Sequence, residues 1–202
     1  MLILNLGCGV NRRRLYSEPF PEGVVHIDRN PDVHPDIVQD LDLGLPVKYC
    51  LGEFANKVDE IHAYHIVEHL GVMGDTRVWF QFWRDCWRAL KPGGLMYVLA
   101  PWFQHEDAVG DPTHVRLICK QTYHFLNRQA YAVKEGQFGC AMSKLAIDFD
   151  LQVAEHKLMN KSGEFVPCTL ATVLRAVKTA DGELVPMDMR KDWQHQKEAA
   201  TV

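Results

Sequence analysis

The sequence has no long apolar run. Its N-terminal apolar stretch is short and has no charged region before it, so it is neither the core of a signal peptide nor a membrane span. Internal repeats and low-complexity segments are also missing. We therefore expect a cytoplasmic protein that makes no contact with a membrane.

Paired cysteines are also missing. The chain carries six scattered cysteines: Cys8, Cys50, Cys86, Cys119, Cys140 and Cys168. Because no two of them form a Cys-x-x-Cys pair, the pattern argues against a structural zinc site. Cysteines of this kind in a cytoplasmic protein are expected to stay reduced.

Neither sign of charge is in large excess. Lys and Arg number 22 and Asp and Glu number 26, which gives a formal net charge of −4. Such a chain has no global attraction for nucleic acid or for an anionic membrane. One local basic cluster, Arg12 to Arg14, is interpreted as the solvated face of a helix rather than as a phosphate site.

The length fits one α/β domain. At 202 residues and 47% hydrophobic content, the chain can bury a substantial core but is too short for two ordinary domains. We assign residues 1–185 to that domain. Residues 186–202 are polar and charged with no sustained apolar period, so we expect a mobile tail, or one that packs on a partner.

Apolar segments of strand length alternate with segments that can be helical. Strands are expected at 2–6, 24–27, 37–39, 60–64 and 95–100. This alternation predicts an α/β, Rossmann-like, doubly wound sheet that is mostly parallel and has helices on both faces. Two late strands, 151–159 and 170–178, would form a C-terminal hairpin that supplies an antiparallel edge strand.

A helix is expected after Gly74. Large apolar side chains recur there at helical spacing, and Pro92 ends the pattern. They belong to Trp79, Phe82, Trp83, Cys86, Trp87 and Leu90. We interpret this stripe as core packing.

A glycine turn follows the first predicted strand. Residues 2–9 read Leu-Ile-Leu-Asn-Leu-Gly-Cys-Gly, and Asp28 ends the next apolar run. Glycine lets the backbone approach a ligand closely, and a carboxylate about 20 residues further on can accept hydrogen bonds from two ribose hydroxyls. The third glycine of the dinucleotide fingerprint is missing, because Asn11 and Arg12 stand there instead. The pattern predicts a nucleotide-like cofactor; the alternative is a tight turn without a ligand, with Asp28 capping the next helix.

Three further motifs follow in order. They are the carboxylate-bearing stretch 36–46, the Glu-His-Leu of residues 68–70 and the Leu-Lys-Pro-Gly-Gly turn of residues 90–94. With the glycine turn and Asp28, they make the sequence resemble the class I S-adenosylmethionine-dependent methyltransferases, in particular small single-domain members of the methyltransferase type 11 kind. The resemblance covers residues 2–127. It implies S-adenosyl-L-methionine as cofactor and methyl transfer to an oxygen or nitrogen atom of an acceptor.

The resemblance also implies which residues hold the cofactor. The backbone from Leu6 to Gly9 would face the methionine part, Asp28 the ribose, and Asp40 the adenine. Asn5 stands where the family more often has an acidic residue, so one charged partner of the cofactor's ammonium is lost. The implied set is Asn5, Leu6, Gly7, Cys8, Gly9, Asp28, Arg29, Asp40, Leu41, His65, Ile66 and His69. The alternative for Asp40 and its neighbour Asp42 is a solvated loop.

The segment from Trp102 to Arg116 is the densest group of titratable side chains. It follows the fifth predicted strand, at the edge where such a sheet opens toward the acceptor. Histidine suits a general base because its pKa is near neutral, so the catalytic candidates are Asp111, His114 and His105. Arg116 would anchor an acidic group of the substrate. The alternative is a polar loop in which Asp111 caps a turn.

A metal is not expected. An aspartate and two histidines of this segment are metal-binding residue types, but their spacing matches no defined metal site. Glu68 and His69 are expected at the start of a helix after the fourth strand. In the family such a pair lies beside the cofactor cleft, where it could orient the cofactor, take part in catalysis or serve the structure.

A small metabolite or a saccharide is the favoured acceptor, because no basic surface is evident. A nucleic-acid or protein acceptor stays open, as does the oligomeric state. One rival is a catalytically silent module that binds S-adenosylmethionine or a related nucleoside and acts through a partner protein, its acceptor pocket filled by Trp102 or Phe103. Another is a nicotinamide-dependent oxidoreductase, which the missing third glycine disfavours.

Overall fold

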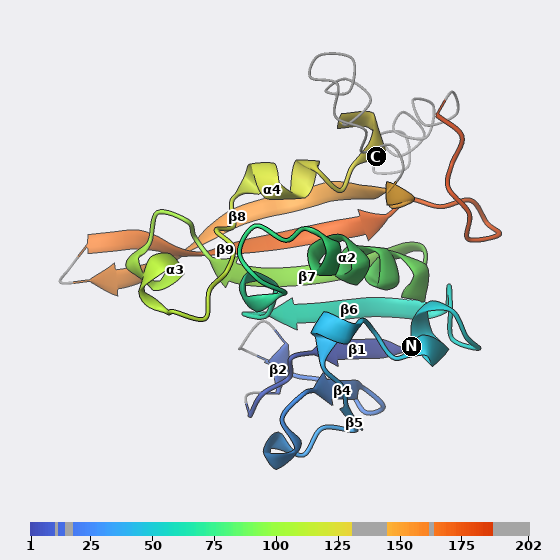
Figure 1. Cartoon of the computed structure of the whole chain (residues 1–202), viewed down its shortest axis with the longest axis horizontal. Helices are drawn as coiled ribbons and strands as arrows, with labels where there is room; N and C mark the ends of the chain where they lie inside the picture. Colours follow the sequence, from blue (N-terminus) through green and yellow to red (C-terminus); the bar gives the residue numbers. More distant parts are fainter. Residues whose placement is uncertain (11, 15–17, 131–144, 162–163, 188–202) are drawn as a thin grey trace.

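A computed structural model describes residues 1–10, 12–14, 18–130, 145–161 and 164–187 (Figure 1). The expected C-terminal tail therefore lies outside the described residues from position 188 onward, and so does Cys140. No helix in the described part of the chain has the length and apolar character needed to cross a membrane.

A seven-stranded sheet runs through the molecule in the order β5-β4-β1-β6-β7-β9-β8 (Figure 1). Its parallel part consists of β5 (Ile37–Val38), β4 (Val25–Asp28), β1 (Ile3–Leu6), β6 (Val58–Tyr64) and β7 (Leu90–Pro101). The strand order reverses at β1, which pairs with β4 on one side and β6 on the other. At such a reversal the carboxyl ends of the strands leave a crevice that can take a ligand.

The C-terminal hairpin closes one edge of the sheet. It consists of β8 (Phe149–Lys161) and β9 (Glu164–Ala176), which pair antiparallel to each other. β9 also pairs antiparallel with β7, with Ala171 opposite Leu99. The predicted Rossmann-like sheet with an antiparallel edge is thus confirmed. β8 extends beyond its expected bounds at both ends, whereas β9 begins and ends earlier in the chain than expected.

The connection from β1 to β4 differs from the expectation. It contains a short antiparallel pair, β2 (Arg13–Arg14) and β3 (Glu18–Pro19), so the interpretation of the arginine cluster as a helix face is wrong. Arg14 forms an ion pair with Glu60 of β6 at 2.8 Å. Arg12 donates to the carbonyl oxygen of Val33 at 2.5 Å and to that of His34. Both side chains fasten this arm to the sheet and the loop after β4.

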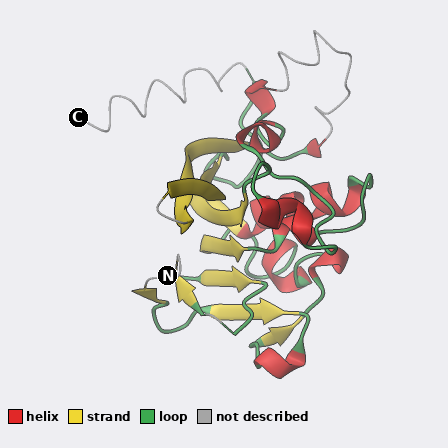
Figure 2. Ribbon diagram, turned by 90° about the vertical axis from the view of Figure 1, so that its left-hand side faces the viewer, coloured by secondary structure: helices red, strands yellow, loops and turns green. Residues whose placement is uncertain are grey.

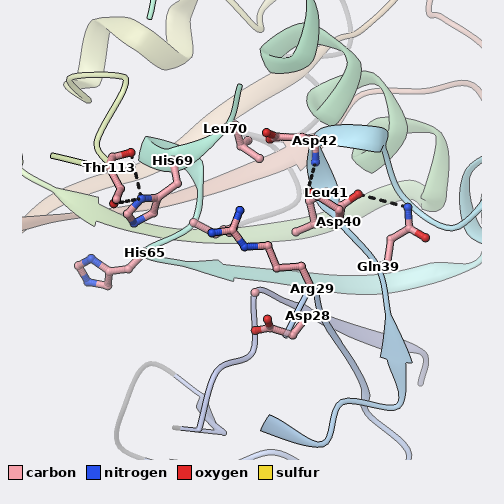
Figure 3. A pocket seen from close by; sticks show the side chains of 12 residues that line it. Asp28, Arg29, Gln39, Asp40, Leu41, Asp42, His65, His69, Leu70 and Thr113 are labelled. Atoms are coloured by element: carbon pink, nitrogen blue, oxygen red, sulfur yellow. Dashed lines mark hydrogen bonds between the residues drawn. The ribbon is translucent and has the colours of Figure 1, made fainter. Parts of the chain in front are cut away.

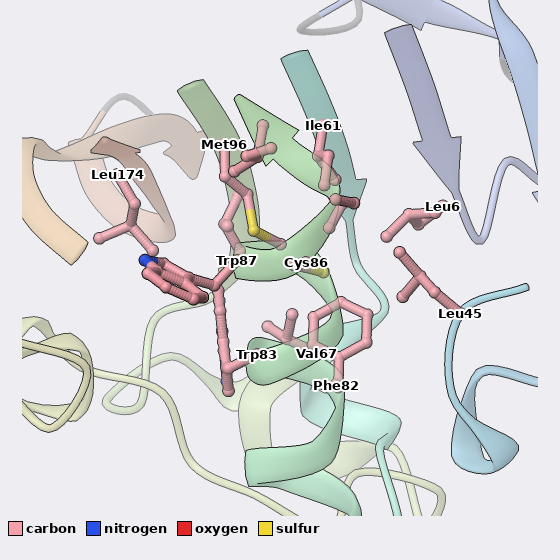
Figure 4. Packing of buried hydrophobic residues seen from close by; sticks show 14 of the residues in the cluster. Leu6, Leu45, Ile61, Val67, Phe82, Trp83, Cys86, Trp87, Met96 and Leu174 are labelled. Atoms are coloured by element: carbon pink, nitrogen blue, oxygen red, sulfur yellow. The ribbon is translucent and has the colours of Figure 1, made fainter. Parts of the chain in front are cut away.

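The main core lies on one face of the sheet. α1 (Val47–Cys50), α2 (Arg77–Ala89) and α4 (Lys120–His124) gather there, as Figure 2 shows. The aromatic stripe of α2 points into this core, where Trp83 is fully buried (Figure 4). Its ring meets Tyr123 of α4 and Phe149 of β8 edge to face, with centroids 5.9 and 6.2 Å apart. The interpretation of the stripe as core is confirmed.

The opposite face of the sheet carries polar and aromatic side chains. His62 of β6 is buried there, stacked on Tyr97 of β7 at 4.7 Å and touched edge to face by Phe20 at 4.9 Å. The arm that contains β2 and β3 supplies this cover, since Phe20 follows β3. Within the described residues, helices therefore cover one face of the sheet, whereas the alternation of segments predicts them on both.

Candidate functional site

A pocket of about 240 Å³ opens at the carboxyl ends of β1, β4 and β6 (Figure 3). Four short elements follow the strands that end at this edge: η1 (Pro31–Val33) after β4, η2 (Leu41–Leu43) after β5, η3 (Val67–His69) after β6 and α3 (Glu106–Gly110) after β7. The pocket is lined by Gly7, Asp28, Arg29, Gln39, Asp40, Leu41, Asp42, His65, Ile66, His69, Leu70 and Thr113. It coincides with the crevice that the reversal of strand order creates.

Asp28 is held in place at the end of β4. Its Oδ2 accepts the backbone N–H of Gly9 at 2.9 Å, and its Oδ1 accepts that of Asn30 at 2.9 Å. The carboxylate is partly buried and lines the pocket. A carboxylate has further acceptor capacity beyond these two bonds, so it can also receive hydroxyl donors of a ligand.

Gly7 lies where the backbone leaves β1 with φ +61°. A Cβ at this position would stand 3.0 Å from the side chain of Ile66, which follows β6. Both the left-handed backbone and the close neighbour require glycine. The turn thus brings the main chain against Ile66 at the floor of the pocket.

The residues around Asp40, which the resemblance assigns to the adenine, form an ordered turn. Asp40 Oδ1 accepts the N–H of Asp42 at 3.0 Å and so caps η2. Asp42 Oδ1 in turn accepts the N–H of Gly71 at 2.9 Å, which ties η2 to the chain after η3. Leu41 between them is buried and offers an apolar wall.

The pocket contains most, but not all, of the residues that the resemblance implies. Asn5, Leu6, Cys8 and Gly9 do not line it. Asn5 is buried within β1, with its Nδ2 3.1 Å from His26 Nδ1. Burial also raises the pKa of the Cys8 thiol.

Four lining residues were not among the implied set: Gln39, Asp42, Leu70 and Thr113. Gln39 and Asp42 stand inside the stretch 36–46, and Leu70 ends the Glu-His-Leu motif, so their proximity to the implied residues was a usable signal. Thr113 comes from the segment assigned to the acceptor, and nothing in the sequence indicates that it reaches the cofactor side.

A second pocket adjoins the first. It is lined by His65, Pro101, Glu106, Asp107, Gly110, Asp111, Pro112, His114, Cys168 and Thr169. His65 lines both pockets. Its backbone has φ +53°, an uncommon value for a residue with a side chain. Its N–H donates to Leu99 O at 2.8 Å, which fixes this turn to β7.

The three catalytic candidates separate in the structure. Asp111 and His114 line the second pocket, with His114 Nε2 3.8 Å from Asp111 Oδ2. His105 lines neither pocket, because it is buried as the N-cap of α3, where Nδ1 accepts the N–H of Asp107 at 3.2 Å. A hydrogen bond from Val115 N–H to Glu68 O at 2.9 Å holds the end of this segment against η3.

Arg116 points away from the second pocket. Its guanidinium stacks over the ring of Trp79 at 4.5 Å and donates to Asp75 O at 3.0 Å. Burial lowers the pKa of this guanidinium. The residue lines a separate apolar hollow together with Trp79 and Phe80. The expectation that Arg116 anchors an acidic substrate group in the acceptor pocket is not met by this placement.

A comparison with solved structures finds the same fold in many methyltransferases. A SAM-dependent methyltransferase from Archaeoglobus fulgidus matches with a TM-score of 0.53 and 15% identity, over 86% of this chain and 85% of that one. The N-methyltransferase NodS from Bradyrhizobium japonicum WM9 matches with a TM-score of 0.53 and 11% identity, over 88% and 86%.

A third match has ligands bound. It is the Burkholderia thailandensis 1,6-didemethyltoxoflavin-N1-methyltransferase with 1,6-didemethyltoxoflavin and S-adenosylhomocysteine, with a TM-score of 0.53 and 13% identity over 88% of this chain and 71% of that one. No protein-family model matches the sequence, and no curated protein sequence matches it significantly. The chain has the fold of the class I S-adenosylmethionine-dependent methyltransferases.

Proposed function

We propose, from the fold shared with the class I methyltransferases, that the chain is an S-adenosylmethionine-dependent methyltransferase. One observation carries the proposal: the pocket at the ends of β1, β4 and β6 shares His65 with a second pocket beside it. A methyl transferase needs two such sites in contact, one for the donor and one for the acceptor. The methyl group would go to an oxygen or nitrogen atom, most readily of a small molecule.

The first pocket has the groups that an adenosyl ligand requires. Asp28, held by two backbone N–H groups, would accept hydrogen bonds from the ribose hydroxyls. Leu41 would pack against the adenine, beside the ordered turn at Asp40. The glycine turn at Gly7 would let the methionine part approach the main chain.

S-adenosylmethionine, when bound, supplies an activated methyl group with a good leaving group. The protein's task is then chiefly to hold donor and acceptor in line. His65 stands at the junction of the two pockets, and Asp111 and His114 line the acceptor side. There Asp111 and His114 would contact the acceptor and orient its reacting atom.

Two neighbours of the fold favour a small nitrogen-bearing acceptor. One is named as an N1-methyltransferase of 1,6-didemethyltoxoflavin and another as an N-methyltransferase. The alternative, a silent module with a filled acceptor pocket, needs Trp102 or Phe103 inside that pocket. Neither residue lines it; Trp102 packs instead against His156 with ring centroids 4.1 Å apart.

The first test is calorimetric titration with S-adenosylmethionine, S-adenosylhomocysteine and NAD. We expect both adenosyl compounds to bind and NAD not to bind. A labelled methyl donor then serves to screen small amines, phenols and saccharides for methyl transfer. If neither adenosyl compound binds at millimolar concentration the proposal fails, and binding without any transfer would favour the silent module.

A further inference from the structure

Glu68 is a buried carboxylate with an unusual lack of partners. Its residue is 1% exposed, and within the described part of the chain neither carboxylate oxygen takes part in a hydrogen bond. His65 Nδ1 lies 3.3 Å from Oε1, but that imidazole is itself 38% exposed. A buried carboxylate costs several kcal/mol unless charge and hydrogen bonds compensate it. The other oxygen therefore still needs a cationic partner.

Two histidines stand beside this carboxylate. Glu68, His69 and His114 each offer a ligand atom, and these atoms lie within 4.8 Å of one another. The two imidazole rings meet with centroids 4.6 Å apart. The hydrogen bond from Val115 N–H to Glu68 O, described above, fixes the two segments together. The cluster is thus built by the fold from residues 45 positions apart in the sequence.

The imidazoles are oriented as metal ligands usually are. His69 Nδ1 lies 3.3 Å from Thr113 O and 3.0 Å from Thr113 Oγ1, and His114 Nδ1 lies 3.3 Å from Ala108 O. When Nδ1–H donates to a backbone carbonyl, the lone pair is on Nε2. Asp111 Oδ1 accepts from Thr113 N–H at 2.8 Å, which steadies the threonine in turn.

We propose that Glu68, His69 and His114 bind a divalent transition-metal ion. A carboxylate and two neutral imidazoles suit zinc and its neighbours in the first transition row, and such a three-residue set leaves coordination positions open. The positive charge of the ion would compensate the negative charge of the buried Glu68 carboxylate. The ligand atoms of all three residues would then have a partner without any change in the fold.

The position of the cluster indicates what the ion could hold. His69 lines the first pocket and His114 the second, so the ion would lie where the two pockets meet. An open coordination position there would bind an oxygen or nitrogen atom of the acceptor and orient it. This role rests on the proposed function, whereas binding of the ion does not.

The test is titration of the full chain with Co²⁺, followed by visible absorption and by calorimetry, with Zn²⁺ as competitor. We expect one equivalent to bind. Glu68→Gln and His114→Asn should each weaken binding by about a hundredfold or more, because loss of a ligand costs at least as much as loss of an outer contact. His34→Asn is the matched control: this exposed histidine has φ +51°, which asparagine tolerates, and it should leave Co²⁺ binding unchanged.

Thermal melting separates loss of the site from loss of the fold. Co²⁺ should raise the melting temperature of the unsubstituted chain. In the absence of metal, Glu68→Gln should melt no lower than the unsubstituted chain, because it removes a buried charge whose one nearby partner is the half-exposed His65. It should also lose the rise with Co²⁺. The proposal is overturned if Co²⁺ and Zn²⁺ fail to bind at about millimolar concentration, or if Glu68→Gln and His114→Asn bind Co²⁺ like the control.

Failure of the metal site and failure of the proposed function are distinguishable. Titration with S-adenosylhomocysteine in a chelating buffer tests the adenosyl pocket alone. Titration with Co²⁺ in the absence of any adenosyl compound tests the metal cluster alone. The first titration therefore decides on the adenosyl pocket and the second on the metal site, each independently of the other.

Discussion

Gly9 donates its backbone N–H to Asp28 Oδ2 at 2.9 Å, which ties the glycine turn after β1 to the end of β4. Two features that the sequence places 19 residues apart therefore form one unit. The carboxylate is fixed before any ligand arrives, and a ligand that uses it does not have to order it.

Replacing this carboxylate should weaken adenosyl binding. We expect Asp28→Ala to lower the affinity for S-adenosylhomocysteine by about 1–3 kcal/mol, the cost of leaving polar partners unmet. Asp28→Asn should lose less, because one oxygen remains as an acceptor. Asp32→Ala, at an exposed position of η1 nearby, serves as control in the same calorimetric titration. Equal affinities in all variants would place the adenosyl site elsewhere.

The glycine at the floor of the pocket gives a second prediction. Gly7→Ala puts a Cβ 3.0 Å from Ile66 in a backbone with φ +61°. Gly93→Ala is the matched control, with φ +75° and no atom within 4 Å of the added Cβ. Because alanine is strained in a left-handed backbone, each variant should lose about 1–2 kcal/mol in the free energy of unfolding, which urea unfolding measures.

The two variants should differ in ligand binding. In Gly7→Ala the side chain of Ile66, which lines the pocket, must shift, so we expect a further loss of stability and weaker binding of S-adenosylhomocysteine. Gly93→Ala should bind like the unsubstituted chain. A Gly7→Ala variant with full affinity would contradict the assignment of this turn to the ligand.

Local pattern was sufficient to predict most of the fold. Alternation of apolar runs predicted the strands, the aromatic spacing predicted α2, and the late apolar runs predicted the hairpin of β8 and β9. The interpretation of Arg12 to Arg14 as a helix face was wrong, because in isolation a run of arginines is compatible with a helix. Their actual partners, Glu60 and the carbonyl oxygens of Val33 and His34, are remote in sequence.

The site was predictable where motifs are local and missed where they are not. Asp28 ends β4, and Asp40 and His65 come just after β5 and β6, so topology alone brings them to one edge of the sheet. The grouping of Glu68 with His114 depends instead on how the segment after β7 folds back onto η3. The spacing of these residues along the chain does not indicate that contact, which explains why no metal was expected.

Arg116 provides a prediction that separates stability from substrate binding. Arg116→Met retains apolar contact with Trp79 but loses the cation and the bond to Asp75 O. We expect a loss of about 1–2 kcal/mol in the free energy of unfolding. The KM for an acceptor found in the methyl-transfer screen should not change. A raised KM with unchanged stability would restore Arg116 as a substrate anchor.

Lys178 is a buried lysine that lies in the core beside Trp87 of α2. It is 4% exposed, and its Nζ donates to Leu90 O at 2.7 Å and to Asn56 Oδ1. The ammonium also lies 4.3 Å from the ring centre of Trp87. Burial lowers the pKa of Lys178 to about 7, and the charge of Glu183 opposes that shift.

This lowered pKa predicts a pH dependence of stability. Between about pH 7 and the usual lysine value of 10.5, the unfolded chain holds a proton at this site that the folded chain has released. The free energy of unfolding should therefore rise with pH in this window, by up to about 1.4 kcal/mol per pH unit, and this dependence should vanish below about pH 7, where both states are protonated. Urea unfolding from about pH 6 to about pH 9 measures it, with Lys178→Met as the reference that lacks the group. The difference between the two chains should stay constant below pH 7 and shift in favour of the unsubstituted chain above it. Parallel curves across the whole range would show that the buried amine keeps an ordinary pKa.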